Sequence, residues 1–324
     1  MENNKKKISK LFIFIIVVAL TLATYGYSAL IAPTHFKLKN ITYTHSSIPQ
    51  GFDGFKIAFI SDFDLQETED FEYLENCIAQ INKAKCDMVI FGGDLYETSN
   101  QFDSERLISI LKSLDIHSGK LAVLGEDEIR SNTDTCIQIL EQSGFEVLRN
   151  NAHFIYSNND RIVIAGLENN GDINSLLNEY MATSFIISAI HQPDYFSEIQ
   201  KSPSLLQLSG HSGGGFINLP FIGGVIKLDH SKTYTNGTVQ INDHTLMITN
   251  GIGLGHNQKI RFNCDPNALI ITLKTSNWCL FLCKQKIGFP LFFNHLNYFT
   301  NKHTMRRFSF IIIFNDIFRH RTNI

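Results

Sequence analysis

The sequence has few cysteines, no excess of basic residues and no internal repeat. Its six cysteines contain no C-x-x-C pair, which excludes the spacing of a zinc ribbon, and a disulfide framework is unusual in a chain of 324 residues. We therefore expect free thiols. The formal net charge of -3 gives no basic surface of the kind that binds nucleic acid. The length allows one large core, or one domain of about 250 residues with appendages.

The clearest local feature is at the N-terminus. A lysine-rich segment, residues 1–10, precedes an uncharged and mostly apolar run, residues 11–32. About 20 such residues span the core of a bilayer as a helix, and flanking lysines favour the cytoplasmic side. We therefore predict a cytoplasmic basic segment, a single-pass transmembrane anchor in the cell membrane, and a domain outside the cytoplasm. A cleaved signal peptide is the alternative, although residues 27–33 offer no clean A-x-A site.

The remainder of the chain alternates between strand and helix patterns. Residues 33–54 are predicted to be a polar connector, and residues 55–274 to be the folded domain. Short apolar runs alternate with stretches of helical spacing, as in Phe55–Ser61 followed by Phe71–Lys83. Further strands are expected at 87–93, 121–124, 162–165, 185–190, 205–209, 245–249 and 269–273, and further helices at 102–114, 173–182 and 193–201.

This alternation predicts the fold class. Strands that flank helices form βαβ units and a largely parallel inner sheet. So many apolar strands must pack as two layers covered by helices. We therefore predict an α/β fold, a two-layer β-sandwich flanked by helices (α/β/β/α), preceded by one N-terminal transmembrane helix. The last segment, residues 275–324, is rich in Phe, Asn, Ile and basic residues without a period. It is assigned no function, and an aberrant extension or a membrane-associating tail would have this composition.

Polar side chains follow the ends of successive apolar strands. They are Asp62, Asp64, Asp94, Glu126, Asp127, His191 and His211. Because the carboxyl ends of strands in an open α/β sheet converge on one crevice, we expect these side chains to meet. Carboxylate oxygens and imidazole nitrogens together bind Mn, Fe, Zn or Mg. A single Asp after a strand is more often a turn or a helix cap, but five such positions in order favour a metal site.

The same segments resemble motifs of the calcineurin-like metallophosphoesterase superfamily. They are IAFISDFDL (57–65) for D-x-H, DMVIFGGDL (87–95) for G-D-x, VLGEDE (123–128) for G-N-H-[DE], IHQPD (190–194) for S-H-x-P, and SGHSGGGFINLP (209–220) for G-H-T-H-G-G-Q-x-x-x-P. Two later segments, GLG (253–255) and IRFNC (260–264), resemble the end of a membrane-anchored bacterial phosphodiesterase subgroup. The resemblance implies a metal-dependent phosphodiesterase or phosphatase that acts outside the cytoplasm on an envelope or lipid phosphoester.

The motifs that would hold the first of the family's two metal ions are degenerate. The resemblance assigns this ion to an Asp, a His, a bridging Asp and the second His of G-H-x-H. Asp62 and the bridging Asp94 match this pattern. Asp64 stands at the position of the first His, and Gly213 at the position of the last, where it leaves no side chain.

The motifs for the second ion are better preserved. Asp94, His191 and His211 match the family's ligands, while Glu126 stands where the family has Asn. Asp127 stands where the family has the catalytic His that supports the transition state or protonates the leaving group. An ordinary aspartic acid, with a pKa of about 3.9, is a poor proton donor at neutral pH. Loss of a general acid commonly costs about 10²–10⁴ in rate.

These substitutions shift the ligands from nitrogen toward oxygen. We therefore expect one or two divalent ions, with Mn, Mg or Ca favoured over Zn. The preferred hypothesis is one hard cation held by Asp94, Glu126, His191 and His211, with Asp62 and Asp64 as further contributors and Asp127 as the catalytic residue. The expected partners are a phosphoester substrate and the membrane, and no nucleic acid. A catalytically inactive binding module with the same fold is the alternative function, and a decaying gene product is a third interpretation.

Overall fold

The computed structural model describes residues 2–65, 69–96, 103–131, 133–168, 172–182, 185–253 and 260–276. Side chains are described from Lys10 onward, except those of Glu69, Asp127 and Ser131. The predicted tail, residues 275–324, lies outside this range except for its first two residues. Of the six cysteines, Cys279 and Cys283 also lie outside it. The other four are free and buried.

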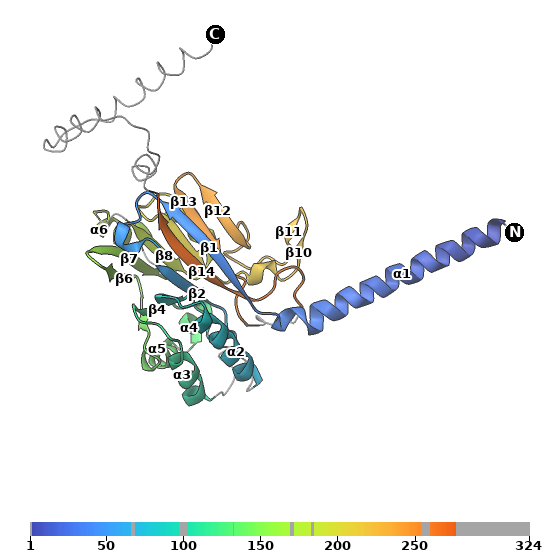
Figure 1. Cartoon of the computed structure of the whole chain (residues 1–324), viewed down its shortest axis with the longest axis horizontal. Helices are drawn as coiled ribbons and strands as arrows, with labels where there is room; N and C mark the ends of the chain where they lie inside the picture. The colour runs from blue at the N-terminus through green and yellow to red at the C-terminus, as the bar shows by residue number, and fades with distance from the viewer. Residues whose placement is uncertain are drawn as a thin grey trace, which may run out of the picture. The chain divides into compact units, whose positions relative to one another are not determined.

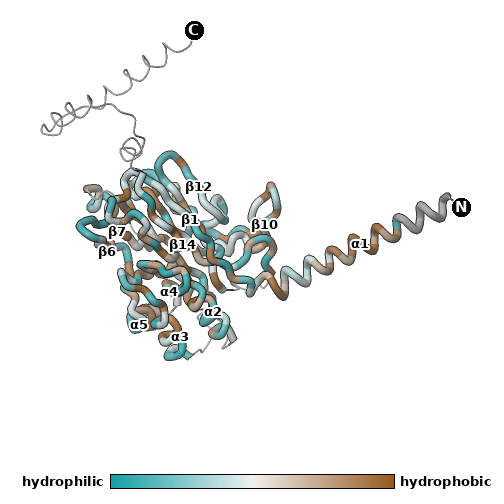
Figure 2. Tube along the Cα trace, in the orientation of Figure 1, coloured by the Kyte–Doolittle hydropathy of each residue, from teal (hydrophilic) through white to brown (hydrophobic). Residues whose placement is uncertain are grey.

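The N-terminal segment forms one long helix, α1 (Glu2–Leu30), which is followed by a short 3-10 turn, η1 (Ala32–Thr34). The stretch Lys10–Thr34, which covers most of α1 together with η1, is long and apolar enough to cross a membrane, by length and composition alone, with a mean hydropathy of 2.1. Figure 2 shows mostly hydrophobic colouring along this helix. Most of its apolar side chains are exposed, as expected if lipid rather than protein covers them.

Two six-stranded sheets form the centre of the domain (Figure 1). The first has the order β1 (Lys37–His45), β14 (Asn267–Thr275), β2 (Lys56–Ile60), β3 (Met88–Phe91), β4 (Lys120–Ala122) and β5 (Glu146–Val147). The second has the order β12 (Gly237–Ile241), β13 (His244–Ile248), β9 (Leu206–Ser209), β8 (Ile186–Ile190), β7 (Asp160–Leu167) and β6 (Asn151–Ser157). A small antiparallel pair, β10 (Asn218–Leu219) and β11 (Gly223–Gly224), is separate from both.

Most strand pairs in the two sheets are parallel, as predicted. Strands β2 to β5 are parallel neighbours in the first sheet, and β7, β8, β9 and β13 in the second. The exceptions are β14 against β2, and the edge strands β6 and β12, which are antiparallel to their partners. Parallel strands require crossovers, and helices of the described chain provide several of them.

Helices cover the outer faces of both sheets. On the first sheet these are α2 (Glu69–Lys83), α3 (Ser104–Lys112) and α5 (Thr133–Gln142), and on the second α6 (Ile173–Glu179) and α7 (Phe196–Ile199). A further short helix, α4 (Glu126–Ser131), follows β4, and 3-10 turns η2 (Gln50–Phe52), η3 (Pro193–Tyr195) and η4 (Gly213–Gly215) lie in loops. The predicted α/β/β/α sandwich is confirmed.

Strand β2 shows why the central strands have continuous apolar sequences. Successive side chains of a strand point to opposite faces of its sheet. Ile57 and Phe59 therefore pack between the two sheets, while Ala58 and Ile60 pack under the helices. Both faces are dry, so every position is apolar. Burial of each large side chain is worth about 1.5–3 kcal/mol.

One prediction about organisation was wrong. Residues 33–54 were expected to be a connector, but residues 37–45 form β1, which pairs in parallel with β14 along its whole length. The burial pattern explains the error. Only Tyr43 of the nine residues is buried, because β1 is an edge strand, and apolar and polar residues alternate only over Ile41–Thr44, which is a short signal.

Candidate metal centre

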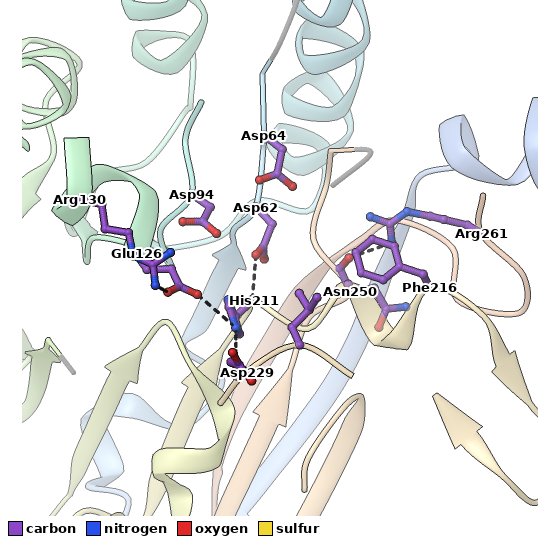
Figure 3. Close-up of a pocket in the computed structure, with 12 residues that line it drawn as sticks. Asp62, Asp64, Asp94, Glu126, Arg130, His211, Phe216, Asp229, Asn250 and Arg261 are labelled. Carbon is purple, nitrogen blue, oxygen red and sulfur yellow. Dashed lines mark hydrogen bonds and ion pairs between the residues drawn. The ribbon is translucent and has the colours of Figure 1, made fainter. Parts of the chain in front are cut away.

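The carboxyl ends of strands from both sheets meet at one place (Figure 3). Asp62 and Asp64 follow β2, Asp94 follows β3, Glu126 begins α4 after β4, His191 follows β8, and His211 follows β9. Five of these residues line one cavity of about 270 Å³, and His191 lies against it in contact with Asp94 and His211. The sequence predicted this convergence, and the structure brings the six residues together.

Four of these residues have an unusual backbone conformation. Asp62, Asp64, Asp94 and His211 have positive φ angles of 51°, 45°, 57° and 67°. Such a conformation costs about 1–3 kcal/mol for a residue other than glycine, and it persists only where surrounding contacts enforce it. Here the loops after β2 and β3 are joined, since Asp62 N donates to the Gly93 carbonyl at 2.9 Å. Several strained backbone positions at one site are typical of a functional site.

His191 and Asp94 form the most buried pair of the centre. His191 Nδ1 lies 2.7 Å from the carbonyl oxygen of Gly92, which only accepts, so Nδ1 carries a proton. Nε2 lies 2.9 Å from Asp94 Oδ2. Burial alone would lower the pKa of His191, but Asp94 and Asp62 outweigh it and hold that pKa well above its usual value. Nε2 and the Asp94 carboxylate therefore lie close enough to share a proton or to bind the same metal ion.

His211 completes a set of three ligand groups. Its Nε2 donates to the carbonyl oxygen of Asp229 at 2.7 Å, which leaves Nδ1 available. Burial and the neighbouring His191 lower the pKa of His211, so it is neutral at neutral pH, as a metal ligand must be. One ligand atom from each of Asp94, His191 and His211 lies within 4.8 Å of the others. These three residues fit one divalent ion.

Asp62 is held in place by its neighbours. The hydroxyl of Ser61 donates to Oδ2, and the backbone N–H of His211 donates to Oδ1 at 2.7 Å. A Cβ at Gly210 would meet both Ser61 and Asp62, so this position requires glycine. Asp62 therefore joins the loop after β2 to the loop after β9, and it lines the same cavity as the other residues of the centre.

Glu126 lies at the edge of this group. Its carboxylate lies 3.6 Å from His211 Nε2 and 2.6 Å from the guanidinium of Arg130, one turn later in α4. Arg130 is also part of the cavity wall and is largely exposed. The predicted catalytic residue Asp127 belongs to the same helix, but its side chain lies outside the described part of the chain.

Sequence reasoning missed Glu128, whose side chain is buried at the centre of these loops. Its carboxylate accepts hydrogen bonds from the backbone N–H groups of Asp94, Leu95 and Gly125. Burial and the charge of Asp94 raise the pKa of Glu128 to about 7. The available signal was its position three residues after Gly125, where a glutamate reaches back to the first N–H of a helix.

The side of the cavity that would hold the family's first ion is built differently. A Cβ on Gly213 would lie 2.6 and 2.7 Å from the two Cε atoms of Phe216, so the phenyl ring fills the space that a side chain at 213 would use. Phe216 is 3% exposed, and it stands at the position of Gln in the motif. The guanidinium of Arg261 lies 5.6 Å from the ring centroid. The residues on this side of the cavity therefore do not provide the ligands that hold the family's first ion.

Arg261 is a second residue that sequence reasoning left without a role. It is 1% exposed and lines the cavity, and its terminal nitrogens donate to the carbonyl oxygens of Asn250 and Gly253. Its Nε makes no hydrogen bond to any described residue. Burial, with the charges of Asp94 and Asp62, raises the pKa of Asp64 well above its usual value, and Arg261 offsets this only in part.

Comparison with known proteins gives relatives of one kind, although no family model matches the chain. An uncharacterized metallophosphoesterase of Bacillus subtilis, YkuE, is 32% identical over 260 residues, which are 78% of this chain and 91% of the relative. Phosphodiesterase YaeI of Escherichia coli is 24% identical over 274 residues, 80% of this chain and 97% of the relative. A transmembrane protein with a metallophosphoesterase domain from Danio rerio is 24% identical over 69% of this chain and 57% of its own length.

Proposed function

This chain belongs to the metallophosphoesterase family, whose members are metal-dependent hydrolases of phosphoesters, and we propose that it hydrolyses an envelope or lipid phosphoester outside the cytoplasm with one divalent ion. The observation that carries the proposal is the buried set of Asp94, His191 and His211, whose ligand atoms lie within 4.8 Å of one another. Glu126, Asp62 and Asp64 are further contributors on the walls of the same cavity.

The chain's own residues would perform distinct tasks in this reaction. A divalent ion held by Asp94, His191 and His211 supplies Lewis-acid stabilisation of the charge on a phosphoryl group. Asp229 fixes the orientation of His211 through its carbonyl oxygen, and Gly92 fixes that of His191 in the same way. Orientation by a second layer of hydrogen bonds is the usual arrangement for metal-binding histidines.

Two arginines would attract the anionic substrate. Arg130 and Arg261 both line the cavity, and a guanidinium matches the geometry of phosphate oxygens. They offset the repulsion that the surrounding carboxylates exert on a phosphate. Asp127 is proposed as the residue next to the leaving group. An aspartic acid is ordinarily a weak proton donor at neutral pH, so we expect slow turnover.

The site favours a hard ion and, through its anchor, a substrate near a membrane. Oxygen ligands from carboxylates select Mn, Mg or Ca over Zn. The apolar stretch of α1 supports a single-pass anchor with a cytoplasmic N-terminus, because a lysine-rich segment precedes it. An anchor of this kind holds the domain close to phosphoesters of the membrane or the envelope.

The test is hydrolysis of bis-p-nitrophenyl phosphate by the full chain in detergent with Mn, Mg or Ca. We expect turnover, binding of one ion per chain by elemental analysis, and loss of both in Asp94→Asn. Asp115→Asn, an exposed aspartate on a loop, is the matched control and should leave both unchanged. Turnover that persists in Asp94→Asn, or the absence of bound metal under all loading conditions, would contradict the proposal.

A second candidate function is a catalytically inactive binding module with the same fold. The observation that favours it is the ring of Phe216, which fills the space of a missing ligand beside Gly213. Such a module would bind one ion and a phosphate analogue such as vanadate, but would not turn over any phosphoester. Metal binding without hydrolysis, in protein whose unfolding remains cooperative, would identify this alternative.

A further inference from the structure

A small hairpin beside the metal centre exposes a group of apolar side chains. Strands β10 and β11 pair antiparallel through Asn218 with Gly224 and Leu219 with Gly223. The turn between them contains Phe221 and Ile222, which are 109% and 74% exposed, and Val225 follows at 49%. Single exposed apolar residues are normal, but three on one projecting hairpin indicate a contact surface.

The hairpin is firmly joined to the metal centre. It begins three residues after η4, the turn that follows His211. Val225 N donates to the carbonyl of Ile217 at 2.8 Å, and Ile226 N to the carbonyl of Gly215 at 3.2 Å. A Cβ on Gly224 would lie 2.9 Å from the Cα of Gly215, so the two backbones are in close contact. The tip is therefore held in a fixed position relative to the cavity.

The hairpin is also joined to the domain end of α1 through one intermediate segment. Asn218 N donates to the carbonyl of Phe262 at 2.8 Å, and Ile217 forms a bridge with the same residue. The preceding residue, Arg261, donates its N–H to the carbonyl of Ser28 at 3.0 Å. Ser28 lies in the last turn of α1 and is buried. Figure 1 shows β10 and β11 on the side of the domain where α1 ends.

The end of α1 has the composition of a membrane–water interface. Tyr25 and Tyr27 are 62% and 41% exposed, at the end of the apolar stretch nearer the domain. Tyrosines gather at the level of the lipid headgroups in membrane-spanning helices. Because Ser28 lies one residue after Tyr27 and contacts the segment that is paired with the hairpin, the base of the hairpin is joined to the chain at this level.

We propose that the tip of this hairpin, Phe221 and Ile222 with Val225, inserts into the surface of the bilayer that α1 spans. The tip would then be a second attachment point, which holds the cavity at the lipid surface. Lys227 follows the tip and is exposed, and a lysine there suits the anionic headgroup region. Lipid is the expected partner of the tip because the hairpin is joined to the end of α1, where tyrosines mark the level of the headgroups. This inference requires α1 to be an anchor but does not depend on hydrolysis.

The test measures the depth of the tip in the membrane by fluorescence. The chain has one tryptophan, Trp278, so Trp278→Phe provides a background without tryptophan. Phe221→Trp in this background is reconstituted as the full chain into vesicles of phosphatidylcholine and phosphatidylglycerol, with either ordinary or brominated acyl chains. We expect a blue-shifted emission that brominated lipid quenches.

The matched control is Tyr156→Trp, which replaces an exposed aromatic residue of β6, an edge strand of the second sheet. Its emission should be neither shifted nor quenched by brominated lipid. Equal quenching at positions 221 and 156, or failure of the chain to enter vesicles, would overturn the inference. A blue shift without quenching would also overturn it, because it would show that protein rather than lipid covers the tip.

A second variant separates this inference from the proposed function. Phe221→Ser with Ile222→Ser should keep metal content and cooperative unfolding, since both side chains are exposed and contact no ligand. If the chain is a hydrolase, its activity on soluble bis-p-nitrophenyl phosphate should remain, while activity on a phosphoester in vesicles should fall. The fluorescence result remains readable in a chain with no turnover, so failure of one proposal is distinguishable from failure of the other.

Discussion

Glu128 contributes to the metal centre by accepting hydrogen bonds from the backbone of its loops. Its two carboxylate oxygens serve three backbone N–H groups on two loops, those of Asp94, Leu95 and Gly125. A buried donor without a partner costs about 1–3 kcal/mol. The carboxylate therefore holds the loop of Asp94 against the start of α4.

Replacement of Glu128 should destabilise the domain. In Glu128→Gln an amide N–H₂ takes the place of one accepting oxygen and faces a backbone N–H, so we expect a loss of about 1–3 kcal/mol in the free energy of unfolding. Urea unfolding of the full chain in detergent measures this. Glu126→Gln, on the cavity wall where the carboxylate contacts the side chains of Arg130 and His211, is the matched control and should affect metal affinity more than stability. Equal stability of both variants would contradict this role.

Phe216 determines whether the missing ligand can be restored. Gly213→His alone would drive the imidazole into the phenyl ring, and Gly213 has a positive φ of 54° that disfavours a side chain. We expect this single variant to lose stability and to bind no additional ion. With Phe216→Gln the space opens, and Asp64→His supplies the other ligand.

The triple variant Gly213→His, Phe216→Gln and Asp64→His should bind two ions per chain by elemental analysis, against one for the unaltered chain. If Gly213→His with Asp64→His binds a second ion while Phe216 is retained, the ring does not obstruct the site. Thermal unfolding of each variant with metal removed distinguishes loss of folding from loss of a ligand.

At the scale of elements, β1 extends the first sheet by one strand. It contributes Tyr43 to the core between the sheets, where the ring stacks on Phe185 with centroids 5.8 Å apart. A connector would have no such contact. The strand therefore belongs to the domain, and only His35 and Phe36 lie between the candidate span, which ends at Thr34, and β1.

This role of β1 predicts a loss of stability from one substitution. Tyr43→Ala should reduce the free energy of unfolding by about 3 kcal/mol, because it removes a buried aromatic ring and leaves a cavity. Tyr156→Ala, at an exposed position on the edge strand β6, should change it by less than about 0.5 kcal/mol. Chemical unfolding monitored by circular dichroism compares the two. A neutral effect of Tyr43→Ala would restore the interpretation as a connector.

At the scale of the whole molecule, the metal centre couples stability to pH. Burial raises the pKa values of Asp62, Asp64 and Glu128, the last to about 7, and the pKa of His191 is also raised, by Asp94 and Asp62 against burial. A group whose pKa is higher in the folded state binds its proton more tightly there. Its contribution to stability is complete below its unfolded pKa and is lost as pH rises through its folded pKa.

The metal-free protein should therefore lose stability as pH rises from about 5 to about 8, a window set by the ordinary and raised pKa of Glu128. A divalent ion replaces the protons between the carboxylates, so added Mn should raise the melting temperature more at the upper end of this range than at the lower. Thermal unfolding with a chelator or with Mn, at several pH values, measures both effects. Stability of the metal-free protein that rises over this range would contradict the prediction.

The sequence by itself determined the class of fold and the position of the centre. The apolar runs of the central strands and the 3.6-residue spacing of the helices are local patterns, and both arise because these elements bury particular faces. The polar residues that follow the strands then had to converge, since carboxyl ends of parallel strands share one edge. Asp94, His191 and His211 were therefore among the six metal ligands that the sequence predicted.

Four features depend on contacts that the sequence pattern does not specify, and only the tertiary structure shows them. The exposed edge strand β1 alternates apolar and polar residues only over Ile41–Thr44, and its pairing with β14 is what establishes it as a strand. The three backbone partners of Glu128, the filling of the space beside Gly213 by Phe216, and the link from the hairpin to Ser28 are likewise absent from any local pattern. Hydrophobic periodicity indicates which side of a helix or strand is buried, whereas these features depend on which other element packs against that side.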